Sequence, residues 1–225
     1  MRDADIARGL ELCRAAHWNQ VETDWDYFLK NATCLVAEAN GRVLGTCAVL
    51  DRNGPRAWIA MMLVDPAARR QSIGTLLFER TLAMTNAPSI GLDATAQGRP
   101  LYEKYAFQAV AQIDRWLREP APCDPPPNPI ASRWRKGHVS NQIGPIVAKS
   151  VDDAITRVQT TLAIDGHRSW IIDVPAEAPL AWHRWLQSAG FTAQRTLSRM
   201  YRGQPQSIGS DLYATSGPEY GPVNQ

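Results

Sequence analysis

The chain has 225 residues, a formal net charge of +2, 44% hydrophobic residues and 20% charged residues. These proportions are typical of a soluble globular protein, and no stretch approaches the ~20 consecutive apolar residues that a membrane span requires. The arginines are spread along the chain, so no basic block is available to contact a phosphate backbone. We therefore expect a soluble protein that binds neither membranes nor nucleic acids.

The beginning of the chain and its cysteines indicate the cellular compartment and whether a metal site is expected. The first residues, MRDADIARGLELCRAAHW, carry acidic side chains early and lack the basic, apolar and small-residue order of a secretory signal. The four cysteines are far apart with no C-x-x-C pair, and the four histidines are not at metal-ligand spacing. The sequence predicts a cytoplasmic protein with free, buried thiols and no metal site.

Hydrophobic periodicity predicts a mixed order of helices and strands in the first half. Helices are expected over residues 4–16 and 22–30, followed by a hairpin in CLVAEANGRVLGTCAVLD with its turn at Asn40-Gly41. A strand at 57–64, a helix at 73–85, a short strand at SIGLDAT, a helix opening near Pro100 and a strand at 108–117 follow. This order indicates the α/β class.

A proline-rich segment and an internal repeat predict two domains. The segment EPAPCDPPPNP, residues 119–129, reads as a linker between residues 1–118 and residues 130–225, because proline disfavours regular structure. LYEKYAFQAVAQIDRW (101–116) aligns without gaps with WLQSAGFTAQRTLSRM (185–200), which puts Phe107 opposite Phe191 and Arg115 opposite Arg199. Upstream, SIGLDAT faces SWIIDVP, with a four-residue insertion in the second copy between this strand and the helix that follows. The second half is therefore interpreted as a diverged copy of the first.

The string VDPAARRQSIGTLLFE, residues 64–79, places a turn and a helix start directly after a strand. The first N–H groups of a helix have no internal partner and the helix dipole is positive there, so a pyrophosphate can accept several backbone hydrogen bonds. Arg69 and Arg70 either pair with the phosphates or simply face solvent. The string predicts an anion site.

Two motifs in this region resemble those of the GNAT acetyltransferases. Residues 69–74, RRQSIG, resemble the family's phosphate-binding pattern, with Ser72 where a glycine is usual. Residues 101–107, LYEKYAF, resemble its second motif, with Ala106 where a glycine is usual. AAHWNQVETDW and LDATAQGRPLYE further resemble a subgroup with a C-terminal GNAT-like domain. The resemblance covers nearly the whole chain and implies tandem GNAT-like mixed sheets flanked by helices, with a catalytic first domain and a degenerate second.

The resemblance implies acetyl-CoA as the acyl donor. Main-chain groups of the strand at 57–64 would bind the pantetheine amides by edge pairing, as in peptide β-augmentation. Thr95 stands where the family often has an asparagine that contacts the pantetheine arm. The expected acetyl-CoA-binding residues are Leu63, Val64, Arg69, Arg70, Gln71, Ser72, Ile73, Gly74, Thr75 and Thr95.

The resemblance implies that Tyr102 lies near the thioester sulfur, and it is the expected general acid because acetyl transfer expels a thiolate that a phenol within reach can protonate. The alternative is a tyrosine that only packs on its helix. Many relatives carry a glutamate on the central strand as the base, but WIAMMLV contains no carboxylate. Glu22, Asp24 and Asp93 are the remaining candidates, and the identity of the base stays open.

The resemblance also implies that the loop between the first two helices borders the acceptor. The expected substrate-binding residues are Trp18, Asn19, Gln20, Asp24 and Trp58. Trp18 and Trp25 are equally typical of a helical core. Trp58 and Met61 project from the central strand, and an apolar wall there favours a small, partly hydrophobic amine as the acceptor.

The second half lacks the features that carry this chemistry. VAKSVDDAITRV, residues 147–158, has no glycine and places Asp152 and Asp153 where a pyrophosphate would need to sit. The repeat puts Leu186 opposite Tyr102, which removes the candidate acid. Residues 130–225 are therefore predicted to be a non-catalytic domain.

The favoured function is an N-acetyltransferase in which a small-molecule amine attacks acetyl-CoA directly. The alternatives are a catalytically impaired GNAT-fold module that senses a ligand or binds a partner, and an acyltransferase for a longer acyl group. The sequence leaves open the acceptor, the acyl-chain length, homodimer formation and any ligand of the second domain.

Overall fold

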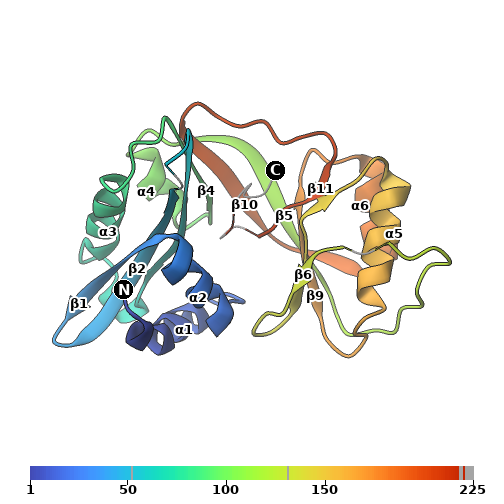
Figure 1. The fold of residues 1–225 in the computed structure, drawn as a ribbon, viewed down its shortest axis with the longest axis horizontal. Helices are drawn as coiled ribbons and strands as arrows, with labels where there is room; N and C mark the ends of the chain where they lie inside the picture. The colour runs from blue at the N-terminus through green and yellow to red at the C-terminus, as the bar shows by residue number, and fades with distance from the viewer. Residues whose placement is uncertain (52, 131, 218–219, 221–225) are drawn as a thin grey trace. The chain divides into compact units, whose positions relative to one another are not determined.

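The computed structural model describes residues 1–51, 53–130, 132–217 and 220. The chain forms two compact units, which Figure 1 shows as a ribbon coloured along the sequence. The first unit contains Met1–Leu92 and Tyr201–Pro205, and the second contains Asp93–Met200 and Gln206–Gln225. The chain passes from one unit to the other at residues 92–93, 200–201 and 205–206, and not within residues 119–129. The predicted division into residues 1–118 and 130–225 describes the two repeats, and it stays a prediction.

The first unit contains most of the first repeat. Its elements are η1 (Asp3–Asp5), α1 (Ile6–Ala15), α2 (Glu22–Asn31), β1 (Thr33–Ala39), β2 (Arg42–Asp51), β3 (Arg56–Val64), η2 (Pro66–Ala68), α3 (Ile73–Leu82) and the start of β4 (Ser89–Ala94). The predicted hairpin turn is confirmed, since Asn40 and Gly41 have φ of 51° and 74°. The predicted helix at 73–85 is confirmed but ends three residues early.

The sheet of the first unit has the order β1-β2-β3-β4. The first three strands are antiparallel, whereas β3 and β4 are parallel. The register of β2 and β3 shifts between Thr46 and Ala48, opposite Met61, whose φ is 53°. The buried Thr46 hydroxyl donates a hydrogen bond of 2.7 Å to the Met61 carbonyl. This β-bulge interrupts β3 in its middle.

Trp25 belongs to the core of the first unit. Its side chain is fully buried, as are those of Phe28 and Phe78. A Cβ added at Gly9 of α1 would lie 2.8 Å from Trp25 Cε2, so the indole packs directly on the α1 backbone. The core reading of Trp25 therefore holds.

The second unit contains the end of the first repeat and nearly all of the second. Its elements are the end of β4, α4 (Arg99–Glu103), β5 (Gln108–Arg118), β6 (Trp134–Arg135), β7 (Asn141–Ile143), β8 (Ile146–Val147), α5 (Val151–Leu162), β9 (Trp170–Pro175), α6 (Leu180–Ser188), β10 (Phe191–Gly203) and β11 (Leu212–Ala214). Residues 119–129 carry no helix or strand and lie within the second unit. None of the helices among the described residues is long and apolar enough to cross a membrane.

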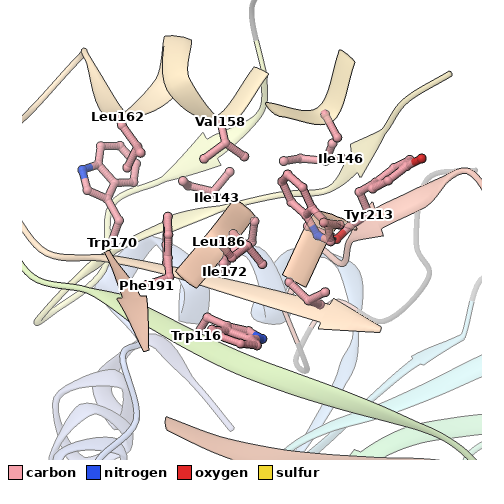
Figure 2. Close-up of a cluster of buried hydrophobic side chains, with 14 of the residues drawn as sticks. Trp116, Ile143, Ile146, Val158, Leu162, Trp170, Ile172, Leu186, Phe191 and Tyr213 are labelled. Carbon is pink, nitrogen blue, oxygen red and sulfur yellow. The ribbon is translucent and has the colours of Figure 1, made fainter. Parts of the chain in front are cut away.

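The core of the second unit lies between its sheet and the helices α5 and α6 (Figure 2). Trp170 and Trp182 are fully buried, and each indole N–H donates to a backbone carbonyl, of Asp165 and Tyr213 respectively. The side chains labelled in Figure 2 are Trp116, Ile143, Ile146, Val158, Leu162, Trp170, Ile172, Leu186, Phe191 and Tyr213.

The two copies exchange their last strands. In the second unit the strands follow one another as β4-β10-β5-β9-β7-β6. The last strand of the first copy, β5, therefore pairs with β9 of the second copy, in antiparallel register from Ile113 to Arg118. The last strand of the second copy, β10, lies beside β4 of the first. The repeat was predictable from the sequence, but this exchange was not.

Candidate functional site

The turn that follows β3 is held by Asp65. Its Oδ1 accepts a hydrogen bond of 3.0 Å from the Ala67 N–H, and its Oδ2 accepts from the guanidinium groups of Arg8 and, at 3.1 Å, Arg42. The Ala67 N–H, together with the two arginines, lowers the pKa of Asp65 although burial opposes this. The sequence analysis missed this cluster; an aspartate directly before a proline at a strand end is the signal that could have found it.

The backbone of the turn leaves its N–H groups open. Arg70 and Ser72 have φ of 63° and 59°, and Ser72 is the N-cap of α3 but its side chain makes no capping hydrogen bond. The Leu76 N–H donates to the Ser72 carbonyl and is the first intrahelical donor, so the N–H groups of residues 73–75 come before it and have no acceptor within the helix. Arg69 to Ser72 are exposed, and the first turn of α3 carries no acidic residue.

Two glycines bring α3 close to the sheet. A Cβ on Gly45 of β2 would lie 2.7 Å from the Leu63 carbonyl oxygen and 2.9 Å from Leu77 Cδ1. A Cβ on Gly74 would lie 3.3 Å from Met62 Cε, so the first turn of α3 packs on the end of β3. This close packing fixes the start of α3 immediately after the turn in the chain.

One edge of β3 is open beside this turn. On one side Leu63 and Val64 are in register with Thr46 and Gly45 of β2. On the other side, within the described part of the chain, pairing with β4 is recorded only over residues 56–58. The two parallel strands are therefore paired at the start of β3 and not beside the turn, and unpaired strand edges of this kind can accept an extended ligand.

Thr95, Gly98 and Tyr102 come together in the second unit. The Thr95 hydroxyl accepts a hydrogen bond of 3.1 Å from the Gly98 N–H, while the Thr95 carbonyl accepts from the Gly98 and Arg99 N–H groups. A Cβ on Gly98 would lie 3.1 Å from Tyr102 Cε2, 3.3 Å from its hydroxyl and 3.4 Å from Thr95 Oγ1. The Tyr102 phenol thus lies against the turn that Thr95 closes, and only 8% of the residue is exposed. Gly98 was missed by the sequence analysis.

The α1–α2 loop contributes a buried polar group. Trp18 is half-buried, and Asn19 and Gln20 are buried. Gln20 Oε1 has no hydrogen-bond partner among the described residues. Asp24 instead serves α2, because its carboxylate accepts a hydrogen bond of 2.8 Å from the Val21 N–H at the helix start.

Trp58 is packed between neighbours on the sheet of the first unit. A Cβ on Gly91 of β4 would lie 2.5 Å from the Trp58 ring, and the ring contacts that of Tyr201 edge-on at 6.2 Å between centroids. Only 3% of Trp58 is exposed. Its indole is therefore largely covered by protein.

Two of the three candidate bases are held by other groups. Asp93 accepts two hydrogen bonds of 2.8 Å from the Arg199 guanidinium in a buried ion pair. Asp24 caps α2, as described above. Glu22 lies exposed in the first turn of α2.

The corresponding helix start in the second copy is already occupied by side chains. The Ser150 hydroxyl accepts a hydrogen bond of 3.2 Å from the Asp153 N–H, and the Asp153 carboxylate accepts one of 3.1 Å from the Lys149 N–H. This N–H lowers the pKa of Asp153, with Arg157 also contributing. Leu186, opposite Tyr102 in the repeat, is fully buried.

The four cysteines, all within the described chain, form no disulfide, and Cys13 and Cys47 are buried as expected whereas Cys34 and Cys123 are only partly buried. Burial raises the pKa of Cys34 to about 11 and that of Cys47 to about 12. Over the described ranges, no group of three histidine, cysteine or acidic side chains could hold a metal ion.

Comparison with known proteins identifies the family. Residues 30–109 and residues 132–214 each match a model of the acetyltransferase (GNAT) domain. A candidate acetyltransferase from Pyrococcus horikoshii has a similar structure, with a TM-score of 0.80 and 19% identity over 97% of this chain and 93% of that chain. A GCN5-related N-acetyltransferase from Sphaerobacter thermophilus gives a TM-score of 0.65 and 14% identity over 94% and 97%. No curated protein sequence matches the chain. With GNAT domains in both halves, the chain belongs to the GNAT acetyltransferases and carries two such domains in tandem.

Proposed function

We propose that the protein is an acetyl-CoA-dependent N-acetyltransferase that acts on a small-molecule amine. The observation that carries this proposal is the exposed turn at the start of α3, where positive φ at Arg70 and Ser72 accompanies open N–H groups and no acidic side chain. Such a turn suits a pyrophosphate.

The main-chain contacts to the donor would come from the first unit. The N–H groups of Ile73, Gly74 and Thr75 would contact the pyrophosphate, with Arg69, Arg70 and Gln71 at its rim and the Ser72 hydroxyl as a further donor. The pantetheine arm would extend along the open edge of β3 at Leu63 and Val64, and Thr95 would offer its hydroxyl proton. The Thr95 oxygen already accepts from Gly98, which leaves that proton for an acceptor on the arm.

The acceptor would bind near the α1–α2 loop. Gln20 Oε1 is a buried acceptor without a partner in the described chain, and an amine N–H would satisfy it. Trp18 and Asn19 are its neighbours in sequence, whereas the contacts of Asp24 and Trp58 favour a supporting role for these two residues.

The proposed reaction is direct attack. The amine nitrogen forms a bond to the acetyl carbon, the C–S bond breaks, and the Tyr102 phenol gives its proton to the departing thiolate. The amine loses one proton to water or to a group not yet assigned. Backbone N–H groups polarise the carbonyl as negative charge develops on its oxygen.

Acetyl-CoA binding tests the proposal. Acetyl-CoA at ~100 times its dissociation constant raises the free energy of unfolding by about 2.7 kcal/mol, so it should raise the Tm. Gly74→Glu places bulk and negative charge in the turn and should abolish the shift. Gly54→Glu is the matched control, because a Cβ there meets nothing within 4 Å, and it should keep the shift. The absence of a shift in the parent chain would refute the proposal.

A catalytically impaired ligand-sensing module is the second candidate. It is favoured by one observation: Asp93 and Asp24 are held by Arg199 and by the start of α2, which leaves no buried carboxylate assigned as base. Thiol release separates the two candidates. A sensor would bind acetyl-CoA without releasing thiol in the presence of any amine.

A further inference from the structure

Two buried ion pairs in the second unit are related by the internal repeat. Arg199 donates to both carboxylate oxygens of Asp93 at 2.8 Å, and Arg115 donates to both oxygens of Asp173 at 2.7 Å. Both aspartate side chains have no exposed surface, and the side chains of Arg199 and Arg115 are 2% and 6% exposed.

Each pair joins one copy to the other. Arg115 lies on β5 and its partner Asp173 on β9, whereas Arg199 lies on β10 and its partner Asp93 on β4. The repeat places the two arginines opposite each other, and likewise the two aspartates. The strand exchange therefore gives each copy an arginine from the other, at equivalent positions.

The Arg199–Asp93 pair lies at the start of the segment that carries the candidate acid. Asp93 is two residues before Thr95, whose hydroxyl and carbonyl bind the N–H groups that open α4. The Tyr102 ring lies against that turn at Gly98. The segment from Asp93 through Tyr102 accordingly belongs to the unit that contains the second copy, and not to the unit that contains the α3 turn.

We propose that Arg199 of the second copy is a positioning residue for the general acid Tyr102 of the first. This inference rests on the proposed function. The planar guanidinium fixes both oxygens of Asp93 and so sets the orientation of the end of β4, from which Thr95 and Gly98 place the phenol. The second copy thereby holds the segment that carries the general acid.

The Arg115–Asp173 pair, which the repeat relates to Arg199–Asp93, supplies a matched control. Arg115 makes the same two contacts, at similar burial, with Asp173. The position that corresponds to Tyr102 beyond Asp173 is occupied by the buried Leu186, so no acid depends on it. Asp173 is also bound by the Gln142 side chain at 2.9 Å.

The experiment compares Arg199→Lys with Arg115→Lys in the full-length chain. Lysine keeps the charge but cannot reproduce the two-point contact. We expect Arg199→Lys to lower kcat for thiol release by roughly 10- to 100-fold, the cost of a small misplacement, with the Kd for acetyl-CoA unchanged. Arg115→Lys should keep kcat within about twofold.

Hydrogen exchange provides a readout that is independent of activity. The Tyr105 and Phe107 N–H groups donate to the Tyr102 carbonyl, and their exchange should accelerate in Arg199→Lys but not in Arg115→Lys. If Arg199→Lys does not fold, Asp93→Asn combined with Arg199→Gln gives a neutral pair that should show the same selective loss.

The outcomes separate the inference from the proposed function. Equal loss of kcat in both lysine variants, or no loss in Arg199→Lys, would overturn the positioning role. A parent chain that releases no thiol would refute the proposed function, while the exchange measurement would still decide whether Arg199 holds the Tyr102 segment. Unaltered exchange in that segment would overturn the inference in either case.

Discussion

Replacing Ser72 by glycine should stabilise the protein. Ser72 has φ of 59° and ψ of 8°, a left-handed conformation that costs a non-glycine residue roughly 1–2 kcal/mol. Its side chain makes no capping hydrogen bond, so the substitution removes no such contact. Glycine also raises the conformational entropy of the unfolded chain, and this offsets about 0.4–1 kcal/mol of that stabilisation. The net expectation for Ser72→Gly is a stabilisation of about 0.5–1 kcal/mol.

Thermal and denaturant unfolding measure this effect. For a chain of this size, 1 kcal/mol corresponds to about 2–4 °C in Tm, so Ser72→Gly should raise Tm by about 1–4 °C. Ser72→Ala is the control: it removes the hydroxyl but keeps the Cβ, and the Tm should stay within about 1 °C of the parent. Destabilisation of Ser72→Gly by about 0.5–1 kcal/mol, the ordinary cost of an added glycine, would refute the assigned backbone conformation.

Three further predictions concern the rest of the molecule. The lowered pKa of Asp65 contributes stability above the ordinary aspartate pKa of ~3.9 that is lost as the pH falls through the lower folded value, so the free energies of unfolding of the parent and Asp65→Asn should differ most near pH 7 and converge once the pH is below that lowered pKa; a constant difference would contradict this. Gly91→Ala drives a Cβ to within 2.5 Å of the Trp58 ring and should cost about 1–3 kcal/mol in denaturant unfolding, whereas a neutral effect would show that the ring is not packed there. Trp170→Ala empties a fully buried position in the second unit and should cost about 3–5 kcal/mol, and a loss below 1 kcal/mol would contradict the core shown in Figure 2.

The elements of the first half were predictable because their signals are local. The Asn40-Gly41 turn and the apolar spacing of residues 73–82 depend only on neighbours in sequence, and the structure confirms both. α4 is shorter than LYEKYAF suggested, because the chain leaves the helix after Glu103 and Ala106 adopts a φ of 62°. The family pattern has a glycine at that position, which is the residue that tolerates such a φ most easily.

The exchanged strands could not be predicted, because the repeat alone fits two arrangements. Alternation of apolar residues in β5 and β10 is satisfied equally by pairing within a copy and by pairing between copies. The choice rests on long-range contacts such as Arg115 with Asp173, which are 58 positions apart in the sequence. For the same reason Asp93 was a reasonable candidate base in the sequence, and only the structure reveals Arg199 as its partner.

The turn beside α3 was located correctly as a strand–turn–helix junction, but its supports were not. Asp65 is bound by Arg8 and Arg42, which come from α1 and from the start of β2. Such contacts between distant segments leave no periodic signal. The roles assigned to the turn, Tyr102 and Gln20 remain predictions that follow from the proposed function.

Thiol release from acetyl-CoA tests the central claim most directly. The assay compares the parent chain with Tyr102→Phe across primary amines of graded hydrophobicity, with acetyl-CoA affinity measured in parallel. The account predicts amine-dependent thiol release by the parent, and a fall in kcat of roughly 10²- to 10⁴-fold in Tyr102→Phe at unchanged affinity. Tight binding of acetyl-CoA without thiol release for any amine, or full activity in Tyr102→Phe, would contradict it.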